Sequence, residues 1–304
     1  MGLRAKNRIQ GPDDRILDGL AAGVSILVLI LMAYPLIYIF SASFSDPMLV
    51  TTGKIILLPK GVTLDGYRLI FEYKPIWTGY RNTIFYAFFG TLINLAITLP
   101  CAYALSRHDL RGRMGFTALF AFTMFFSGGL IPSYLVYKQL GITNTVWAML
   151  LPGATGMWNT VIARTYFQTN IPWELQEAAY IDGSSTMTLF AKIVLPLSAP
   201  IVAVLAIFFA VGHWNAYFNA LVYLSDSRLF PLQLFLRNIL ILNQAEDMMG
   251  ALSADELEEL LRRMQLKESM KYGIVVVSSL PVLMLYPFLQ KHFVKGIMIG
   301  SVKG

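Results

Sequence analysis

Six long stretches of this 304-residue chain contain no lysine, arginine, aspartate or glutamate, and this feature constrains the fold more than any other. They cover residues 19–45, 82–106, 114–137, 139–163, 193–225 and 272–290. A helix needs about 20 apolar residues to cross the hydrocarbon core of a bilayer, so each stretch is long enough or nearly so. The pattern predicts six transmembrane helices, at about residues 19–43, 80–106, 115–137, 143–168, 197–223 and 271–291.

The composition agrees with an all-α, polytopic membrane protein. Apolar residues make up 56% of the chain and charged residues 14%, whereas soluble domains carry about 25% charged residues. The single cysteine, Cys101, excludes an intramolecular disulfide scaffold. Three histidines, His108, His213 and His292, give no basis for a metal cluster, so no metal site is predicted.

Positive charges give the expected orientation. Residues 1–18 are basic and precede an apolar run about twice as long as a signal-peptide core, which favours an uncleaved anchor. With six spans both termini lie on one side, and the lysines and arginines divide evenly between the two sides. The short loop with Arg107, Arg111 and Arg113 favours cytoplasmic termini. The net charge of +6 therefore reflects topology, and no nucleic-acid partner is predicted.

The loop at 169–196, between the fourth and fifth predicted spans, carries local signals for two helices joined by a sharp turn. Pro172 suits the first turn of a helix, and Glu174 complements the positive end of its dipole. Gly183 can adopt the left-handed conformation that ends a helix, and Ser184 or Ser185 can cap the next one, which Pro196 would stop near Leu195. These signals alone fit a docking element or an amphipathic connector on the lipid headgroups.

The same loop resembles the EAA loop of binding-protein-dependent ABC importer permeases. Glu177-Ala178-Ala179, Gly183, Ile193 and Leu195-Pro196 agree with that motif in identity and spacing. The resemblance implies the type I importer permease fold, in which this loop forms coupling helices that insert into a cytoplasmic ATPase. The coupling residues implied are Glu177, Ala178, Ala179, Asp182 and Gly183.

Further likenesses point to the carbohydrate branch of this family. Asn82-Thr83 opens the second span and 102–107 (Ala-Tyr-Ala-Leu-Ser-Arg) closes it, as in maltose-type permeases. Segments 126–132 and 294–304 are similar to those of a branch that takes up oligosaccharides from polysaccharides such as rhamnogalacturonan. The resemblance implies an oligosaccharide importer with a second permease subunit, two ATPase subunits and an extracellular solute-binding lipoprotein. It implies a heterodimer, although the sequence also allows a homodimer.

Aromatic and amide side chains in the fifth span are the candidate substrate contacts. A neutral sugar presents hydroxyls and flat C–H faces, which suit Trp214, Asn215, Tyr217 and Asn219. On a continuous helix Asn215 and Asn219 would share a face, and intramembrane amides tend to face a cavity. They can equally form hydrogen bonds between helices. The charge-free stretches offer no cation for an acidic sugar, whose recognition would then depend on the binding protein or the other subunit.

The segment 226–270 is an expected extracellular insert. Residues 232–242 indicate a surface-lying segment, and Ser253 to Glu256 fit a capping box before a charged helix. This insert could contact the binding protein, or be a solvated addition without a partner; the first outer loop, 46–77, is the other candidate contact.

Enzyme activity is not predicted for this chain. It contains no G-x-x-x-x-G-K-[ST] phosphate-binding loop, no H-E-x-x-H and no G-x-S-x-G. ATP and Mg²⁺ are therefore expected on the partner ATPase, with no cofactor in this chain. The alternative, a self-sufficient carrier or a membrane enzyme with an accidental EAA match, is disfavoured because the charge-free stretches contain no carboxylate.

Overall fold

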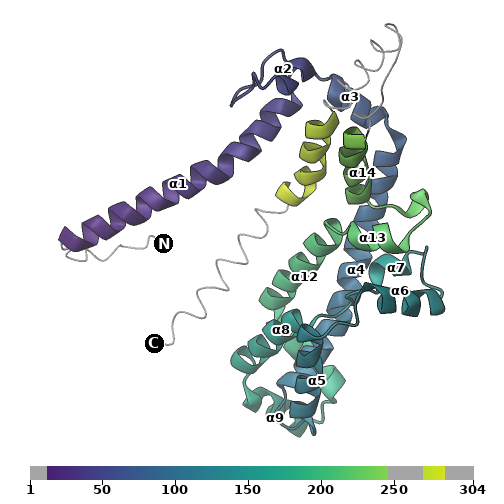
Figure 1. Cartoon of the computed structure of the whole chain (residues 1–304). Helices are drawn as coiled ribbons and strands as arrows, with labels where there is room; N and C mark the ends of the chain where they lie inside the picture. The colour runs from purple at the N-terminus through teal and green to yellow at the C-terminus, as the bar shows by residue number, and fades with distance from the viewer. Residues whose placement is uncertain (1–11, 246–269, 285–304) are drawn as a thin grey trace. The chain divides into compact units, whose positions relative to one another are not determined.

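The computed structural model describes residues 12–245 and 270–284, and every regular element in these ranges is a helix or a helical turn (Figure 1). The chain divides into two units, residues 1–72 with 243–277 and residues 73–242 with 278–304. The predicted all-helical fold is confirmed. The capping box at Ser253 and the charged helix after it lie outside the described residues.

The first unit contains α1 (Pro12–Ser43), α2 (Pro47–Thr51) and α3 (Asp65–Glu72). Helix α1 covers the first predicted span, and its apolar side chains are exposed along its length, as they would be against lipid or another helix. The loop after it is ordered by Asp46, which accepts a bond from the Met48 N–H (2.8 Å) and so caps α2.

The second unit is built around α4 (Lys74–Ser106), a 33-residue helix that contains the second predicted span. It packs against α8 (Met157–Asn170) and α12 (Ala199–Trp214). One apolar core lies between these helices and the loop at 169–196. A second lies between α4, α7 (Trp147–Leu150), α13 (Phe218–Tyr223) and α14 (Leu232–Ala245). Helix α4 therefore contributes to both cores.

Three predicted spans differ from continuous helices. The third divides into α5 (Arg113–Phe125) and α6 (Leu130–Gln139), bent by 115°. Phe126 is extended and ends α5, and Gly129, with a φ of +87°, directly precedes α6. The fourth is interrupted between α7 and α8, where Gly153 has a φ of +71°. The fifth breaks between α12 and α13.

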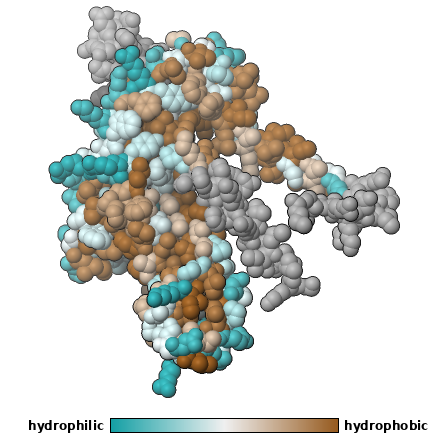
Figure 2. All heavy atoms as spheres, turned by 180° about the vertical axis from the view of Figure 1, so that it is seen from behind, coloured by the Kyte–Doolittle hydropathy of each residue, from teal (hydrophilic) through white to brown (hydrophobic). Residues whose placement is uncertain are grey.

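Apolar side chains cover much of the outer surface of these helices. Figure 2 shows broad brown areas, broken by smaller white and teal patches. By length and composition, two helices of the described ranges can cross a membrane, and as many as four can if each bent pair is one span. The helix Met270–Met284 contains the described part of the sixth predicted span. The surface is that of a membrane protein.

The outer part of the second unit ends in a 3₁₀ turn (Ser227–Leu229) and α14 (Leu232–Ala245). Residues 232–242 were expected to lie on the surface, but Leu232 and Leu234 are fully buried. Leu232 packs so closely on α4 that a Cβ added to Gly79 would lie 3.0 Å from its Cα atom. The start of the expected insert is therefore part of the core.

Candidate functional site

The predicted helix–glycine–helix arrangement is present in the loop at 169–196. Helix α9 (Trp173–Ile181) begins directly after Pro172 and ends at Asp182. Gly183 follows with a φ of +76°, and the Ser184 N–H donates to the Ala179 carbonyl (2.9 Å). This bond satisfies a carbonyl at the end of the helix, as in a Schellman motif.

The second helical segment starts as predicted but ends differently. Ser185 caps α10 (Thr186–Leu189), because its Oγ accepts a bond from the Thr188 N–H (3.2 Å). A π-helical turn (Phe190–Val194) and α11 (Leu195–Leu197) continue it, so Pro196 lies inside the helical path and does not stop it near Leu195. The helical path ends at Leu197, two residues beyond the expected end. The path bends by 83° into α12.

Helix α9 has an inner and an outer face. Gln176 and Ala179 point inward and are about 95% buried. Glu177, Ala178, Asp182 and Gly183 are exposed, beside Ile181, which is 85% exposed. Ala179 was predicted to contact the ATPase, but it packs in the core of its own chain. The outer face of α9, defined by Glu177, Ala178, Ile181, Asp182 and Gly183, is the surface that a partner can reach.

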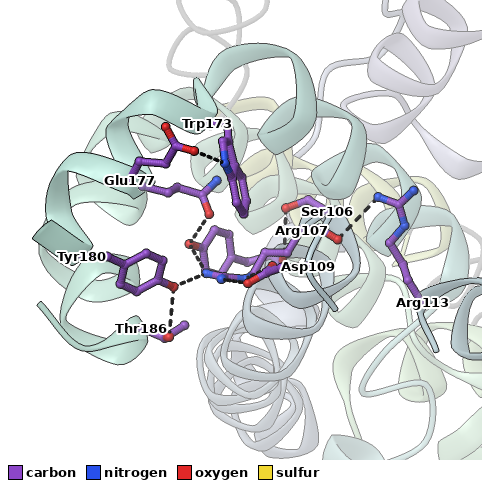
Figure 3. Close-up of polar contacts among 10 residues, drawn as sticks. Ser106, Arg107, Asp109, Arg113, Trp173, Glu177, Tyr180 and Thr186 are labelled. Carbon is purple, nitrogen blue, oxygen red and sulfur yellow. Dashed lines mark hydrogen bonds and ion pairs between the residues drawn. The ribbon is translucent and has the colours of Figure 1, made fainter. Parts of the chain in front are cut away.

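Arg107, at the end of α4, holds α9 from the inside (Figure 3). Its guanidinium donates to the Tyr180 hydroxyl of α9 (2.5 Å) and to the Tyr103 hydroxyl of α4 (3.4 Å). It also forms a two-pronged ion pair with Asp109, with 2.8 Å between Nε and Oδ1. The Tyr103 hydroxyl donates to Gln176 Oε1 (3.3 Å), so two residues of α9 are tied to the same turn of α4.

Aromatic rings complete the surroundings of Arg107. Its guanidinium carbon lies 5.8 Å from the ring centres of Tyr103 and Trp173 and 5.5 Å from that of Tyr180, within cation–π range. The Trp173 indole N–H donates to Glu177 Oε1 (2.9 Å), which fixes the glutamate along the exposed side of α9. The cluster thus positions a residue of the outer face as well as the helix.

The charges of the cluster are fixed by their mutual contact. Hydrogen bonding to Asp109 raises the pKa of Arg107, and the same bond lowers the pKa of the Asp109 carboxyl. Both groups are therefore ionised over the physiological range. A small polar cavity of about 270 Å³ adjoins the cluster, lined by residues that include Ser106, His108 and Trp173.

The predicted substrate residues do not share one helix face. Helix α12 ends at Trp214 and α13 begins at Phe218, so Asn215 and Asn219 lie on either side of a break. The Asn215 side-chain amide donates to the Val211 carbonyl (3.0 Å) in the last turn of α12.

The other predicted substrate residues differ in exposure. Trp214 is buried, and its indole N–H donates to the Ser278 carbonyl (3.1 Å). Tyr217 is 43% exposed, and Asn219 is half-buried. Of the four predicted residues, Asn215 and Tyr217 are thus accessible to a solute, and Trp214 has a packing position.

Two polar contacts between distant parts of the chain are not predicted by the sequence analysis. In the sequence, Arg107 is a loop charge and the last residue of the segment 102–107. Its partner Tyr180 is 73 residues away, so the sequence does not pair the two. His213 Nε2 lies 3.2 Å from Asn94 Oδ1, between α12 and α4, and its ring fills the space beside Gly90. His213 therefore has a packing role between α12 and α4.

Comparison with known proteins gives a family and several relatives. Residues 75–298 match the family described as binding-protein-dependent transport system inner membrane component. The chain is 40% identical to the polygalacturonan/rhamnogalacturonan transport system permease protein YtcP of Bacillus subtilis, over 96% of this chain and 99% of the relative. It is also 40% identical to Protein LplC of the same organism, over 89% of each chain. A crystal structure of a bacterial ABC transporter involved in the import of the acidic polysaccharide alginate has a chain with 33% identity and a TM-score of 0.83, covering 94% of this chain and 100% of that one.

Proposed function

The chain belongs to the binding-protein-dependent transport system inner membrane components, and from this premise we propose how it works in its transporter. It is the permease subunit of an ABC importer for oligosaccharides and acts in the cell membrane. The observation that carries the coupling role is the exposed outer face of α9, presented by a helix–glycine–helix loop that α4 holds from behind. This face docks on the ATPase.

The substrate class follows from the relatives. YtcP is named for transport of polygalacturonan and rhamnogalacturonan, and the structural relative imports alginate, so we assign acidic oligosaccharides to this chain. Asn215 and Tyr217 are the accessible polar and aromatic side chains near the break between α12 and α13. They suit hydroxyls and sugar faces, and the binding protein recognises the carboxylates.

Six spans with both termini in the cytoplasm complete the topology. The arginine-rich loop at 107–113 and the loop at 169–196 are joined through Arg107 and Tyr180, which supports their placement on the same side of the membrane. An excess of arginine marks cytoplasmic loops, so this side is the cytoplasm. The side that carries the 3₁₀ turn Ser227–Leu229 then faces outward.

The complete transporter needs further chains. One subunit of this size cannot enclose a path for an oligosaccharide, so two permease chains are needed. The family resemblance favours a heterodimer with a second, related permease. Two ATPase subunits bind ATP and Mg²⁺, and an extracellular lipoprotein delivers the sugar. Closure of the ATPase dimer moves the docked α9 and rocks the helices between outward and inward states.

The test is purification of the tagged chain from its native host in mild detergent, with mass spectrometry of the proteins that co-elute. We expect an ATPase, a second permease and a sugar-binding lipoprotein. Ala178→Trp adds bulk to the outer face of α9 and should release the ATPase but keep the second permease. Arg111→Trp, at an exposed position of the loop at 107–113 and away from that face, is the matched bulky variant and should keep the ATPase. A chain that purifies alone and moves or modifies a sugar would favour the carrier or enzyme alternative.

A further inference from the structure

Both ends of α4 are fastened to loops far away in the sequence. The inner end holds α9 through Arg107 and Tyr103, as described above. These bonds join side chains of residues that lie 73 positions apart in the case of Arg107 and Tyr180. A motion of α9 therefore reaches α8 through the chain itself and reaches α4 through this cluster.

The outer end of α4 holds the 3₁₀ turn and the residues after it, 228–232. The Asn82 amide donates to the carbonyls of Arg228 (2.8 Å) and Phe230 (3.0 Å). The Tyr86 hydroxyl donates to the Leu229 carbonyl (2.8 Å). The side chains of Asn82 and Tyr86 are both buried, so these bonds are shielded from water.

Thr83 adds a fourth bond at the same end. Its Oγ1 accepts the Leu232 N–H (2.8 Å) at the start of α14, and Thr83 is fully buried. Four consecutive hydrogen bonds from one turn of α4 thus fix the backbone of the outer segment 228–232. Asn144 holds the residues just before it, because its Oδ1 accepts the N–H groups of Ser225 (3.0 Å) and Asp226 (2.8 Å).

We propose that α4 is a rigid link between the coupling helix α9 and the outer segment 228–232, with Arg107 and Asn82 as the positioning residues at its two ends. This inference rests on the proposed function, which places α9 against the ATPase and 228–232 on the outer side. Helix α4 is unbroken from Asn82 to Ser106, even at Pro100 inside it, and Arg107 is its C-cap; the distance from Asn82 to Arg107 is about 38 Å at 1.5 Å per residue. A binding protein that docks outside and an ATPase that docks inside would thus act on the two ends of one element.

The measured quantity is the ratio of ATP hydrolysis with and without the binding protein. The whole transporter is reconstituted in lipid nanodiscs, and the binding protein is added with a mixture of oligogalacturonates as the probe. We expect Arg107→Gln to lower this stimulation about tenfold, because glutamine cannot keep the bonds to Asp109, Tyr103 and Tyr180 together. Arg111→Gln, which removes an exposed arginine of the same loop, should leave the stimulation unchanged.

At the outer end, Asn82→Ala should lower the stimulation to a similar extent. Its control is Thr78→Ala, about one turn away on the same helix. Tyr180→Phe removes a single hydroxyl from the inner cluster and provides a milder variant for complexes in which Arg107→Gln does not assemble. In all variants the amount of ATPase that co-purifies reports on assembly.

The double variant Arg107→Gln with Asn82→Ala distinguishes one rigid link through α4 from two sites that act independently. Effects of sites this far apart are usually independent, which would multiply two tenfold losses to about a hundredfold. If α4 is one rigid link, breaking it at a second end adds nothing. The double variant should then lose about tenfold in stimulation, as each single variant does. A hundredfold loss, full stimulation in the single variants, or loss of ATPase in both Arg107→Gln and Tyr180→Phe would overturn the inference. Absence of stimulation in the wild-type transporter would instead contradict the proposed function.

Discussion

Replacing Gly183 by valine tests the coupling loop at its most constrained backbone position. Gly183 has a φ of +76°, and a Cβ atom added there would meet no other atom within 4 Å. The substitution therefore introduces backbone strain without a steric clash in the chain. A non-glycine residue in the left-handed region costs about 1–2 kcal/mol, and a β-branched residue costs more.

A cost of about 2 kcal/mol would lower the population of the native turn about 30-fold relative to its alternatives. Because this turn sets the direction in which α10 leaves α9, we expect sugar uptake per ATP hydrolysed to fall by about an order of magnitude. A series should order the effect by backbone tolerance, with glycine best, then asparagine, then alanine, then valine. The remaining core does not contact Gly183, so the amount of folded chain should stay the same.

The assay is sugar uptake and ATP hydrolysis measured together in proteoliposomes that contain the whole transporter. Gly53→Val is the matched control, because Gly53 has a φ of +68°, also has open space around it, and lies in the first outer loop. Equal uptake per ATP in the Gly183→Val and wild-type proteins would refute the argument. So would an equal loss in the Gly53→Val protein, since the effect would then be general strain.

Two further predictions concern helix packing and charge. Gly90→Ala places a Cβ 2.3 Å from His213 Nε2, so we expect a loss of about 1–3 kcal/mol in stability, read as a lower unfolding temperature in detergent, whereas Gly212→Ala, with open space around its Cβ, should have little effect. Asp109 has a lowered pKa through its bond with Arg107, so its stabilising contribution is fully present above the unfolded pKa of about 3.9 and is lost as the pH falls through the folded value. The difference in unfolding temperature between wild type and Asp109→Asn should be constant from about pH 5 to 8, shrink as the pH falls below about 4, and vanish only below the lowered folded pKa of Asp109; a difference that varies between pH 5 and 8 would contradict this assignment.

Local signals in the sequence correctly predicted the helix–glycine–helix form of the loop at 169–196. Pro172, Gly183 and Ser185 each act over a few residues, through a fixed φ, a left-handed turn and a side-chain cap, so their effects can be read without knowledge of the rest of the fold. At Pro196 the expected helix end near Leu195 was two residues early, since the helical path ends at Leu197 before it bends into α12. The expectation that Asn215 and Asn219 share a helix face was wrong, because hydropathy detects a long apolar run and does not detect the break between α12 and α13 inside it.

The sequence by itself determined that this is a helical membrane protein with an EAA loop. Charge-free stretches exclude a soluble fold, because apolar surface of that extent cannot be left in water. Composition and short motifs can be read from the sequence without knowledge of the tertiary structure. They also carried the family resemblance, which the match over residues 75–298 confirms.

Only the tertiary structure decided which face of α9 is available and what holds it. Ala178 and Ala179 are equivalent in the motif, yet one is exposed and the other is buried, because the packing of α9 on α4 selects the inward face. The partner of Arg107 is likewise decided by folding, which brings Tyr180 to it across 73 residues. Contacts of this kind depend on how helices pack, and no local pattern encodes them.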